Sequence, residues 1–189
     1  MTVVFKRRYS DPEAVPELAK TLGACLPEEG EIIFICIGTD KNILDCMGPM
    51  VGSMIKEKAP ELTVYGTLED PIHALNITRA LHGIRNRHPG ALEVAIDASA
   101  GKADEVGVIQ VRLGSLDPGK AVRKRLPAVG NLSVTGIVVA DDGESGYLKT
   151  GLGSICPVYH IACAIANSVC MAKESLLARA RAGCGSKEG

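Results

Sequence analysis

The chain has 189 residues, of which 46% are hydrophobic, and its 21 Lys and Arg nearly balance its 22 Asp and Glu. A chain of this length suits one domain around one hydrophobic core. The formal charge of −1 argues against a nucleic-acid partner, because proteins that bind phosphate backbones carry a surplus of Lys and Arg on one face. Aromatic residues make up only 3% of the chain, which leaves few rings to stack on bases or sugars.

Residues 1–30 are predicted to form an N-terminal helical extension. The basic triplet at residues 6–8 is typical of a solvated surface. Ser10 follows it, and Pro12 and Glu13 complete the pattern of a helix N-cap and first turn. We therefore expect a helix that runs from this cap to about Cys25.

Five apolar segments have the composition of β-strands. The first, residues 31–38, is rich in β-branched residues and suits a strand that is buried on both faces in the middle of a parallel sheet. Residues 106–113 alternate between apolar and polar side chains, which favours the edge of a sheet. The other predicted strands are residues 62–67, 91–98 and 132–140.

Predicted helices separate these strands. They are residues 45–59, residues 73–88 and a long Ala-rich segment at residues 154–182, preceded or broken at Pro157. Strands that alternate with helices predict an α/β fold, here a three-layer α/β/α sandwich with a mostly parallel sheet. We expect one domain over residues 1–189, with a flexible tail at 183–189.

The cysteine pattern favours a reducing compartment. The seven cysteines, at positions 25, 36, 46, 156, 163, 170 and 184, include no C-x-x-C pair, so no zinc-ribbon or thioredoxin-type site is predicted. The regular spacing of Cys156, Cys163 and Cys170 puts them on one helical face, where we expect small buried side chains. The N-terminus lacks the apolar core of a signal peptide, and no apolar run approaches the roughly 20 residues of a membrane span. We expect a cytoplasmic protein without membrane contact.

Asp45 and Asp97 are the leading candidates for chemistry. Asp45 follows the strand at 31–38 after a short loop, and Asp97 ends the strand at 91–98. Ligands bind at the C-terminal edge of a parallel sheet, where neighbouring strands lie about 5 Å apart. Two carboxylates that converge there can share a proton and activate water, or they can bind a divalent cation. An alternative for Asp45 is a helix N-cap.

A second polar cluster, at residues 69–73, follows the strand at 62–67. Asp70 and His73 in this cluster could orient a substrate, and His73 could act as a base or a metal ligand. The same residues also fit the capped start of a helix.

Three further segments carry polar residues without a defined motif. Residues 120–125 hold four basic side chains, which suit a solvated loop or an arm for an acidic partner. Residues 141–146 form an acidic turn, and the Gly-rich residues 151–154 could hold an anion with backbone N–H groups. No Walker A or dinucleotide motif follows a strand, so no nucleotide cofactor is predicted.

Four ordered blocks resemble the YyaC-type family of sporulation proteins. They are IGTDKNILDCMGPMVG (37–52), YGTLEDPIHALN (65–76), AIDASAG (95–101) and LDPGKAVRKRLPAVGNLSVTGIV (116–138). That family is similar in turn to the spore germination protease and, more distantly, to hydrogenase maturation endopeptidases. The resemblance implies their phosphorylase/hydrolase-like α/β/α sandwich.

The resemblance also implies roles for the candidate residues. The germination protease has an aspartate, thought to be catalytic, in a D-x-x-G-P block that D-C-M-G-P matches here with Asp45 and Gly48. Its second aspartate lies in an I-D-A block that Asp97 matches. In the hydrogenase maturation enzymes, the equivalent acids bind nickel of the substrate. The His that completes that nickel site has no matching motif here, and His73 is the candidate for its place.

The function implied by the resemblance is that of a sporulation-associated endopeptidase, in the cytoplasm of the sporulating cell or the spore. Asp45 and Asp97 would activate water or hold a divalent metal, and Asp70, His73 and Gly48 would bind a protein or peptide substrate, such as a small spore protein. A homo-oligomer is compatible with the apolar composition. The alternative is a non-catalytic regulatory protein of sporulation that binds a peptide or a metal at the same edge of the sheet.

Overall fold

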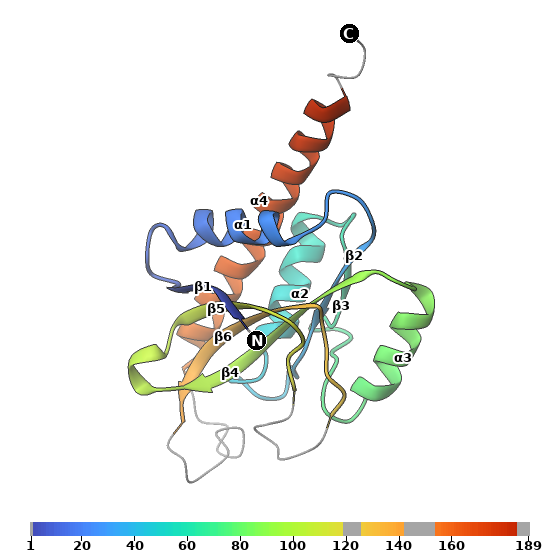
Figure 1. Cartoon of the computed structure of the whole chain (residues 1–189). Coiled ribbons are helices and arrows are strands. Elements are labelled where there is room, and N and C mark those ends of the chain that lie inside the picture. Colours follow the sequence, from blue (N-terminus) through green and yellow to red (C-terminus); the bar gives the residue numbers. More distant parts are fainter. Residues whose placement is uncertain (1, 119–125, 142–153, 185–189) are drawn as a thin grey trace.

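The computed structural model of the chain describes residues 2–118, 126–141 and 154–184, with side chains as far as residue 176. Its centre is a six-stranded sheet in the order β1-β5-β6-β4-β2-β3 (Figure 1). The strands are β1 (Thr2–Arg8), β2 (Ile32–Cys36), β3 (Thr63–Tyr65), β4 (Leu92–Gly101), β5 (Val108–Leu113) and β6 (Leu132–Ala140).

The sheet is mostly parallel, as predicted. β2 pairs in parallel with both β3 and β4, and β4 pairs in parallel with β6. β5 runs antiparallel to its neighbours β1 and β6. β5 is therefore an inner strand, and the prediction that residues 106–113 lie at an edge is wrong.

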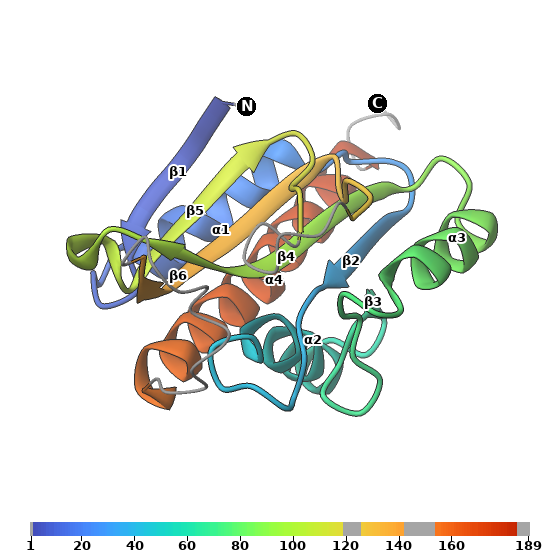
Figure 2. The same cartoon turned by 90° about the horizontal axis from the view of Figure 1, so that it is seen from below.

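The helices form two layers on the faces of this sheet. They are α1 (Ala14–Cys25), α2 (Met47–Lys58), α3 (Ile77–Arg87) and α4 (Ile155–Cys184), with a short 3-10 turn η1 (Ala103–Glu105). α1, α2 and α4 cover one face, and α3 packs on the other face near β2 and β3 (Figures 1 and 2). This arrangement is the predicted α/β fold with three layers.

Each face of the sheet buries its own aliphatic cluster, because side chains alternate between the faces along each strand. Phe34, Cys36 and Ile96 belong to the larger cluster, with the apolar sides of α1, α2 and α4. Ile33 and Ile35 belong to the smaller cluster, with side chains of α3. The smaller cluster also includes Leu116 and Val129, which pair with each other between β5 and β6.

The N-terminal residues form a strand, which corrects the prediction that residues 1–30 are a helical extension. β1 pairs with β5 and buries Phe5 in the larger cluster, so a long-range pairing decides the structure of this segment. The helix begins at Ala14, later than predicted, and ends at Cys25 as expected. Lys and Arg side chains on an outer strand hinder pairing with another sheet, which is a common protection for an edge.

Two other predictions about side chains need correction. Cys156 is exposed, and Cys163 and Cys170 are partly exposed, so this face of α4 is not a buried cysteine stripe. The segment Ile155–Leu176 of α4 also meets the length and hydropathy criteria for a membrane span, with 50% of the apolar window buried inside the protein. The prediction that no apolar run approaches such a length is therefore wrong, although core helices meet the same criteria. Pro157 lies in the first turn of α4 and does not interrupt the helix.

Several predicted segments fall outside the described residues. They are the basic segment 120–125, residues 142–146 of the acidic turn, residues 151–153 of the Gly-rich segment and residues 185–189 of the tail. Gly183 and Cys184, which were assigned to the tail, belong to α4.

Helix α2 lies directly on the backbone of the sheet. A Cβ atom placed on Gly52 would lie 2.2 Å from the backbone oxygen of Gly66, just after β3, and one placed on Gly48 would lie 2.1 Å from the backbone oxygen of Ile37, just after β2. Only glycine leaves room for such an approach. The two glycines are one helical turn apart, so together they fix the position of α2.

We expect Gly52→Ala to lower the free energy of unfolding by about 3 kcal/mol, since the added methyl group would meet backbone that cannot move aside easily. The matched control is Gly83→Ala in α3, where the nearest atom is a flexible Arg87 nitrogen at 3.6 Å. That control should be neutral or more stable, because Ala favours a helix. Chemical unfolding of both variants tests this, and equal stabilities would contradict the close approach of α2.

Candidate active site

The candidate site lies where the chain leaves β2 and β4 in opposite directions. β2 continues through α2 to β3 on one side, whereas β4 continues through η1 to β5 and β6 on the other. Neighbouring strands that diverge in this way leave a crevice at their C-terminal ends, and ligands of α/β proteins bind there. The sheet order therefore places the site between β2 and β4.

Asp97 lies at the base of this divergence. The last residue of β2, Cys36, pairs with Ile96, the residue before Asp97. On its other side β4 continues, and Asp97 pairs with Thr135 of β6. Asp97 therefore lies inside β4, and the prediction that it ends the strand is wrong. It is the first residue of β4 beyond the pairing with β2. Its side chain points toward the face of the sheet that carries α3.

A tight loop returns Asp45 to the same place. The backbone N–H of Thr39 donates to the backbone oxygen of Asp45 at 3.1 Å, and a Cβ atom on Gly38 would lie 1.9 Å from that oxygen. Gly38 has a φ of +142°, which glycine adopts without strain. Cys46, not Asp45, is the N-cap residue of α2, and no side chain caps this helix. The alternative interpretation of Asp45 as an N-cap is therefore wrong.

Protein surroundings make both carboxyl groups weak acids. Burial raises the pKa of Asp45 from 3.8 to about 6, partly offset by a hydrogen bond from the backbone of Thr39. Burial also raises the pKa of Asp97 well above its usual range, and the charge of Asp45 raises it further, against a hydrogen bond from the backbone of Ala98. The two groups therefore interact electrostatically, and Asp97 keeps its proton more strongly.

The two groups therefore differ in their tendency to ionise. Asp45 is mainly ionised above its pKa of about 6 and can accept a proton, while Asp97 is the weaker acid and the group better suited to donate one. Like charges brought together in a site of low polarity produce such unequal pairs. Paired carboxyl groups with separated pKa values are typical of acid–base catalytic sites.

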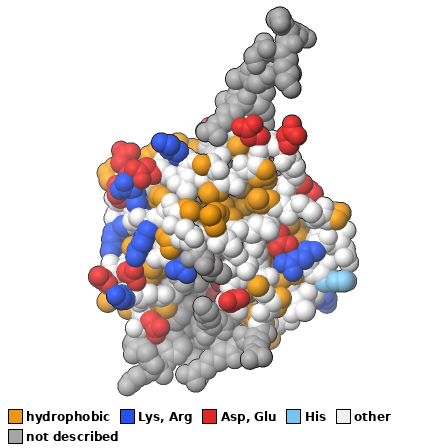
Figure 3. All heavy atoms as spheres, in the orientation of Figure 1, with side chains coloured by type: hydrophobic (Ala, Val, Ile, Leu, Met, Phe, Trp, Pro, Cys, Tyr) orange, Lys and Arg blue, Asp and Glu red, His pale blue; other side chains and the backbone are white. Residues whose placement is uncertain are grey.

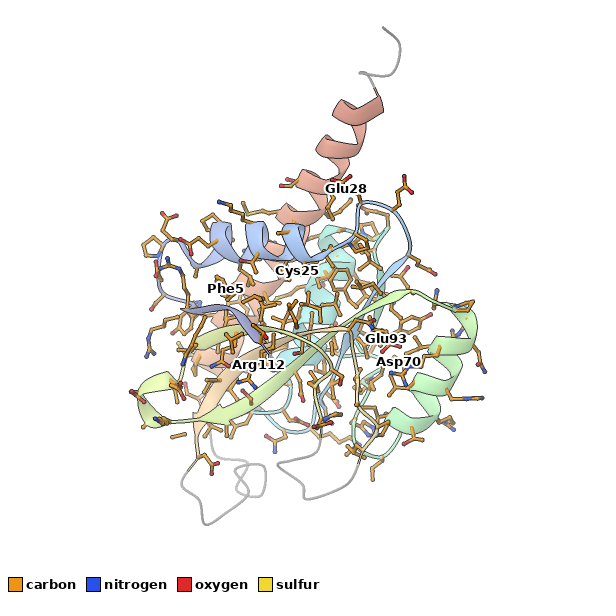
Figure 4. The ribbon with its side chains drawn as sticks, viewed as in Figure 1. Phe5, Cys25, Glu28, Asp70, Glu93 and Arg112 are labelled. Carbon is orange, nitrogen blue, oxygen red and sulfur yellow. The ribbon has the colours of Figure 1, made fainter. Side chains whose placement is uncertain are left out.

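The second predicted cluster lies beside the loop that leaves β2, where the backbone N–H of Gly38 donates to the backbone oxygen of Ile72 at 2.8 Å. Asp70 is exposed and lies beside α3 (Figure 4). His73 accepts a hydrogen bond from the backbone of Leu75 at its Nδ1, and Asn76 stabilises this loop by accepting one from the backbone of His73. Neither residue is among the groups that shift the pKa of Asp45 or Asp97. Their part in substrate binding stays a prediction, as does that of Gly48, which is buried against Ile37.

A resident metal is not supported by the side chains that surround the pair. Within residues 2–118, 126–141 and 154–176, no group of three or more His, Cys, Asp and Glu side chains could hold a metal ion. Two carboxylates alone are fewer protein ligands than zinc sites use, and hard cations take six or more oxygens. The residues described around the pair therefore do not fit a resident metal.

Sequence reasoning missed Thr135. It is the direct neighbour of Asp97 on β6 and shares its face of the sheet. Thr135 is a polar residue inside the apolar run of β6, and it is partly exposed. A polar residue in an apolar strand was the available signal, but only the strand register shows that Thr135 lies beside Asp97.

A family match accompanies this geometry. Residues 6–168 match DUF1256, a family described as a protein of unknown function. The chain belongs to this family. An uncharacterized protein of Bacillus subtilis (strain 168), YyaC, is 37% identical over 144 residues, which are 75% of this chain and 68% of that protein. The predicted membership of a YyaC-type family is confirmed, and these matches assign no activity to this DUF1256 protein.

The coupling of the two aspartates can be measured directly. We expect Asp45→Asn to lower the pKa of Asp97, because the substitution removes a negative charge that opposes its ionisation. Carboxyl ¹³C NMR titration of the full chain would follow Asp97 in both proteins. Asp104→Asn, on the exposed turn η1, is the control and should leave the titration of Asp97 unchanged. An unchanged Asp97 pKa in Asp45→Asn would contradict the coupling.

The raised pKa values also predict how stability depends on pH. Between its ordinary value of 3.8 and its folded value of about 6, Asp45 binds more protons in the native state than in the unfolded chain. The free energy of unfolding therefore falls as pH rises through this window, and Asp97 extends the fall to higher pH. We expect Asp45→Asn to be more stable than the wild type at pH 7 by roughly 1–2 kcal/mol, with the difference vanishing below pH ~4. Thermal unfolding across pH would show the opposite trend if ionised Asp45 stabilised the fold.

Proposed function

We propose that this protein is a peptidase in which Asp45 and Asp97 activate water. The observation that supports this is the pair itself, two carboxyl groups with raised pKa values, of which Asp45 raises the pKa of Asp97 through its charge, where β2 and β4 diverge. The resemblance of D-C-M-G-P and I-D-A to blocks of the spore germination protease favours the same pair.

The proposed reaction uses each carboxyl group twice. Ionised Asp45 takes a proton from water as the water oxygen bonds to the peptide carbonyl carbon, and Asp97 gives its proton to the carbonyl oxygen. The resulting diol collapses as the C–N bond breaks. The leaving nitrogen takes the proton from Asp45, and Asp97 recovers its proton from a diol hydroxyl. The products are a carboxylic acid and an amine, and both aspartates return to their first state.

The surface around the pair suits a peptide. Several large apolar side chains are exposed on segments that follow the C-terminal ends of β2, β3 and β6: Ile43, Leu68, Leu75, Ile155 and Tyr159. Leu75 has 82% of its surface exposed, which is unusual for a leucine without a partner to cover it. These residues would contact apolar side chains of the substrate. We propose small spore proteins as substrates, in the cytoplasm of the sporulating cell or the spore.

Conservative substitution of either aspartate tests the catalytic role. We expect Asp45→Asn and Asp97→Asn each to slow cleavage of small spore proteins at least ~100-fold, because each removes one proton-transfer group. Mass spectrometry of the products gives the rate and the cleavage site. Asp104→Asn is the matched control and should keep the wild-type rate, and circular dichroism should show that all three variants are folded. Wild-type cleavage by either site variant would falsify the mechanism.

The alternative is a regulatory protein that binds a peptide at this crevice without cutting it. The same variants separate the two functions. A binding protein would retain its peptide intact in the wild type and in Asp97→Asn alike, whereas a peptidase would accumulate the intact peptide only in Asp97→Asn.

A further inference from the structure

The face of the sheet that carries α3 is only partly covered by that helix. α3 packs over the side of β2 and β4, and no helix in the described part of the chain lies over β1, β5 and β6 on this face (Figure 2). Polar side chains occupy this remaining area. Asp97, Thr135 and Gln110 are direct neighbours on β4, β6 and β5, so they form one row across the sheet. We call these three residues the polar row.

Arg112 joins the polar row from the next position on the same face of β5. Its Nη2 donates to the side-chain oxygen of Gln110 at 2.6 Å, which directs the guanidinium group back toward the row. Its Nε is buried and has no hydrogen-bond partner, and it is the one such side-chain atom found among the described residues. A buried donor without an acceptor is destabilising, which points to an acceptor that a ligand would supply.

Within the described residues the charge of Arg112 also has no ion-pair partner, unlike that of its basic neighbours. On β1, Lys6 pairs with Glu105 at 2.6 Å, and Arg7 pairs with Glu17 and Asp11. Figure 3 shows this mixture of basic and acidic side chains on the side of the molecule that carries β1. No Asp or Glu of the described chain forms an ion pair with Arg112.

We infer that Arg112 and Gln110 form a subsite that binds a carboxylate of the substrate, beside the Asp45–Asp97 pair. The role of this subsite in a cleavage reaction rests on the proposed function, whereas its binding of a carboxylate does not. A planar guanidinium group with an unpaired Nε–H matches a carboxylate in shape and charge. The amide nitrogen of Gln110 and the hydroxyl of Thr135 add donors along the path from Asp97. Figure 4 shows Arg112 on the side of β1 and β5, away from Asp70 beside α3, so the two groups belong to different parts of the surface.

The strand spacing gives the position of this carboxylate in the substrate. Gln110 lies two strands from Asp97, or about 10 Å, at about 4.8 Å per strand. An extended peptide advances about 3.3 Å per residue. The carboxylate therefore belongs about three residues from the bond that is cut. It can come from an Asp or Glu side chain, or from the C-terminus of the substrate chain.

A binding selection tests this inference separately from catalysis. Full-length Asp97→Asn protein would be presented with two random peptide libraries, one amidated at its C-terminus and one with a free C-terminal carboxylate. We expect enrichment of Asp and Glu at one fixed position in the amidated library if a side chain supplies the carboxylate. Enrichment confined to the free-acid library would identify the chain terminus as the source.

Variants of the subsite provide the decisive comparison. In the Asp97→Asn background, a selected peptide should lose about 10- to 100-fold in affinity when its carboxylate is replaced by an amide, measured by fluorescence anisotropy. Arg112→Gln should abolish this difference in affinity between the carboxylate and amide peptides, and Arg112→Lys should keep part of the difference. Gln110→Glu should also abolish the difference, because the new carboxylate would pair with Arg112 and take the place of the ligand. Arg79→Gln, on the exposed side of α3, is the matched control and should keep it.

The outcomes distinguish the subsite from the peptidase. If neither library shows a carboxylate preference, or if the preference persists in Arg112→Gln, or if phosphoserine is selected in place of Asp and Glu, the subsite is wrong. If selected peptides bind through Arg112 but wild-type protein leaves them intact, the subsite stands and the proposed reaction fails. If wild-type protein cuts peptides without regard to their carboxylates, the reaction stands and the subsite fails.

Discussion

The contact of α2 with the ends of β2 and β3 is the constraint on which the candidate site depends. At Gly48 and Gly52 the helix lies against backbone atoms, with no side chain of its own between them and the chain segments after β2 and β3. The chain must therefore turn sharply between β2 and α2, and Gly38 makes that turn possible. The result is that Asp45, although it belongs to a loop, is held by backbone contacts with Thr39 and Asn42 just after β2. A larger residue at any of these glycines would move Asp45 relative to Asp97.

This rigid placement explains how two acids can be kept in a poorly hydrated crevice. Burial and mutual charge raise the pKa of both groups, which means that their ionisation opposes folding. The burial of the large aliphatic clusters on both faces of the sheet offsets the free-energy cost of ionising these two acids in the folded protein. Elsewhere the fold treats acids differently. Glu93 lies under α3, where Arg85 donates to its two oxygens at 2.6 and 2.9 Å, and this pairing lowers the pKa of Glu93. Glu93 is thus held by a cation, whereas no Lys, Arg or His of the described part of the chain forms an ion pair with Asp97.

The polar row extends from Asp97 on β4 across β6 to Gln110 on β5. α3 and its apolar contacts close one part of that face, so the face is polar only from Asp97 toward β5. Arg112 then provides, at the far end of the row, the positive charge that the aspartates lack. The acids and the arginine lie on one surface but about 10 Å apart, so they do not neutralise each other, and a ligand that bridges them would meet opposite charges at its two ends.

The sequence alone determined the main elements and the two aspartates. The runs at 31–38 and 132–140 are apolar enough to be strands in any context, and the rule that parallel strands bind ligands at their C-terminal ends selected Asp45 and Asp97. Only the tertiary structure decided which elements are neighbours. It made residues 2–8 a strand, put β5 inside the sheet, and placed Thr135 and Gln110 in one row with Asp97, with Arg112 next to Gln110 on the same face. Local patterns fix an element and its buried face because they depend on adjacent residues. Strand order and register depend on pairing between residues far apart in the chain, for which adjacent residues carry no signal.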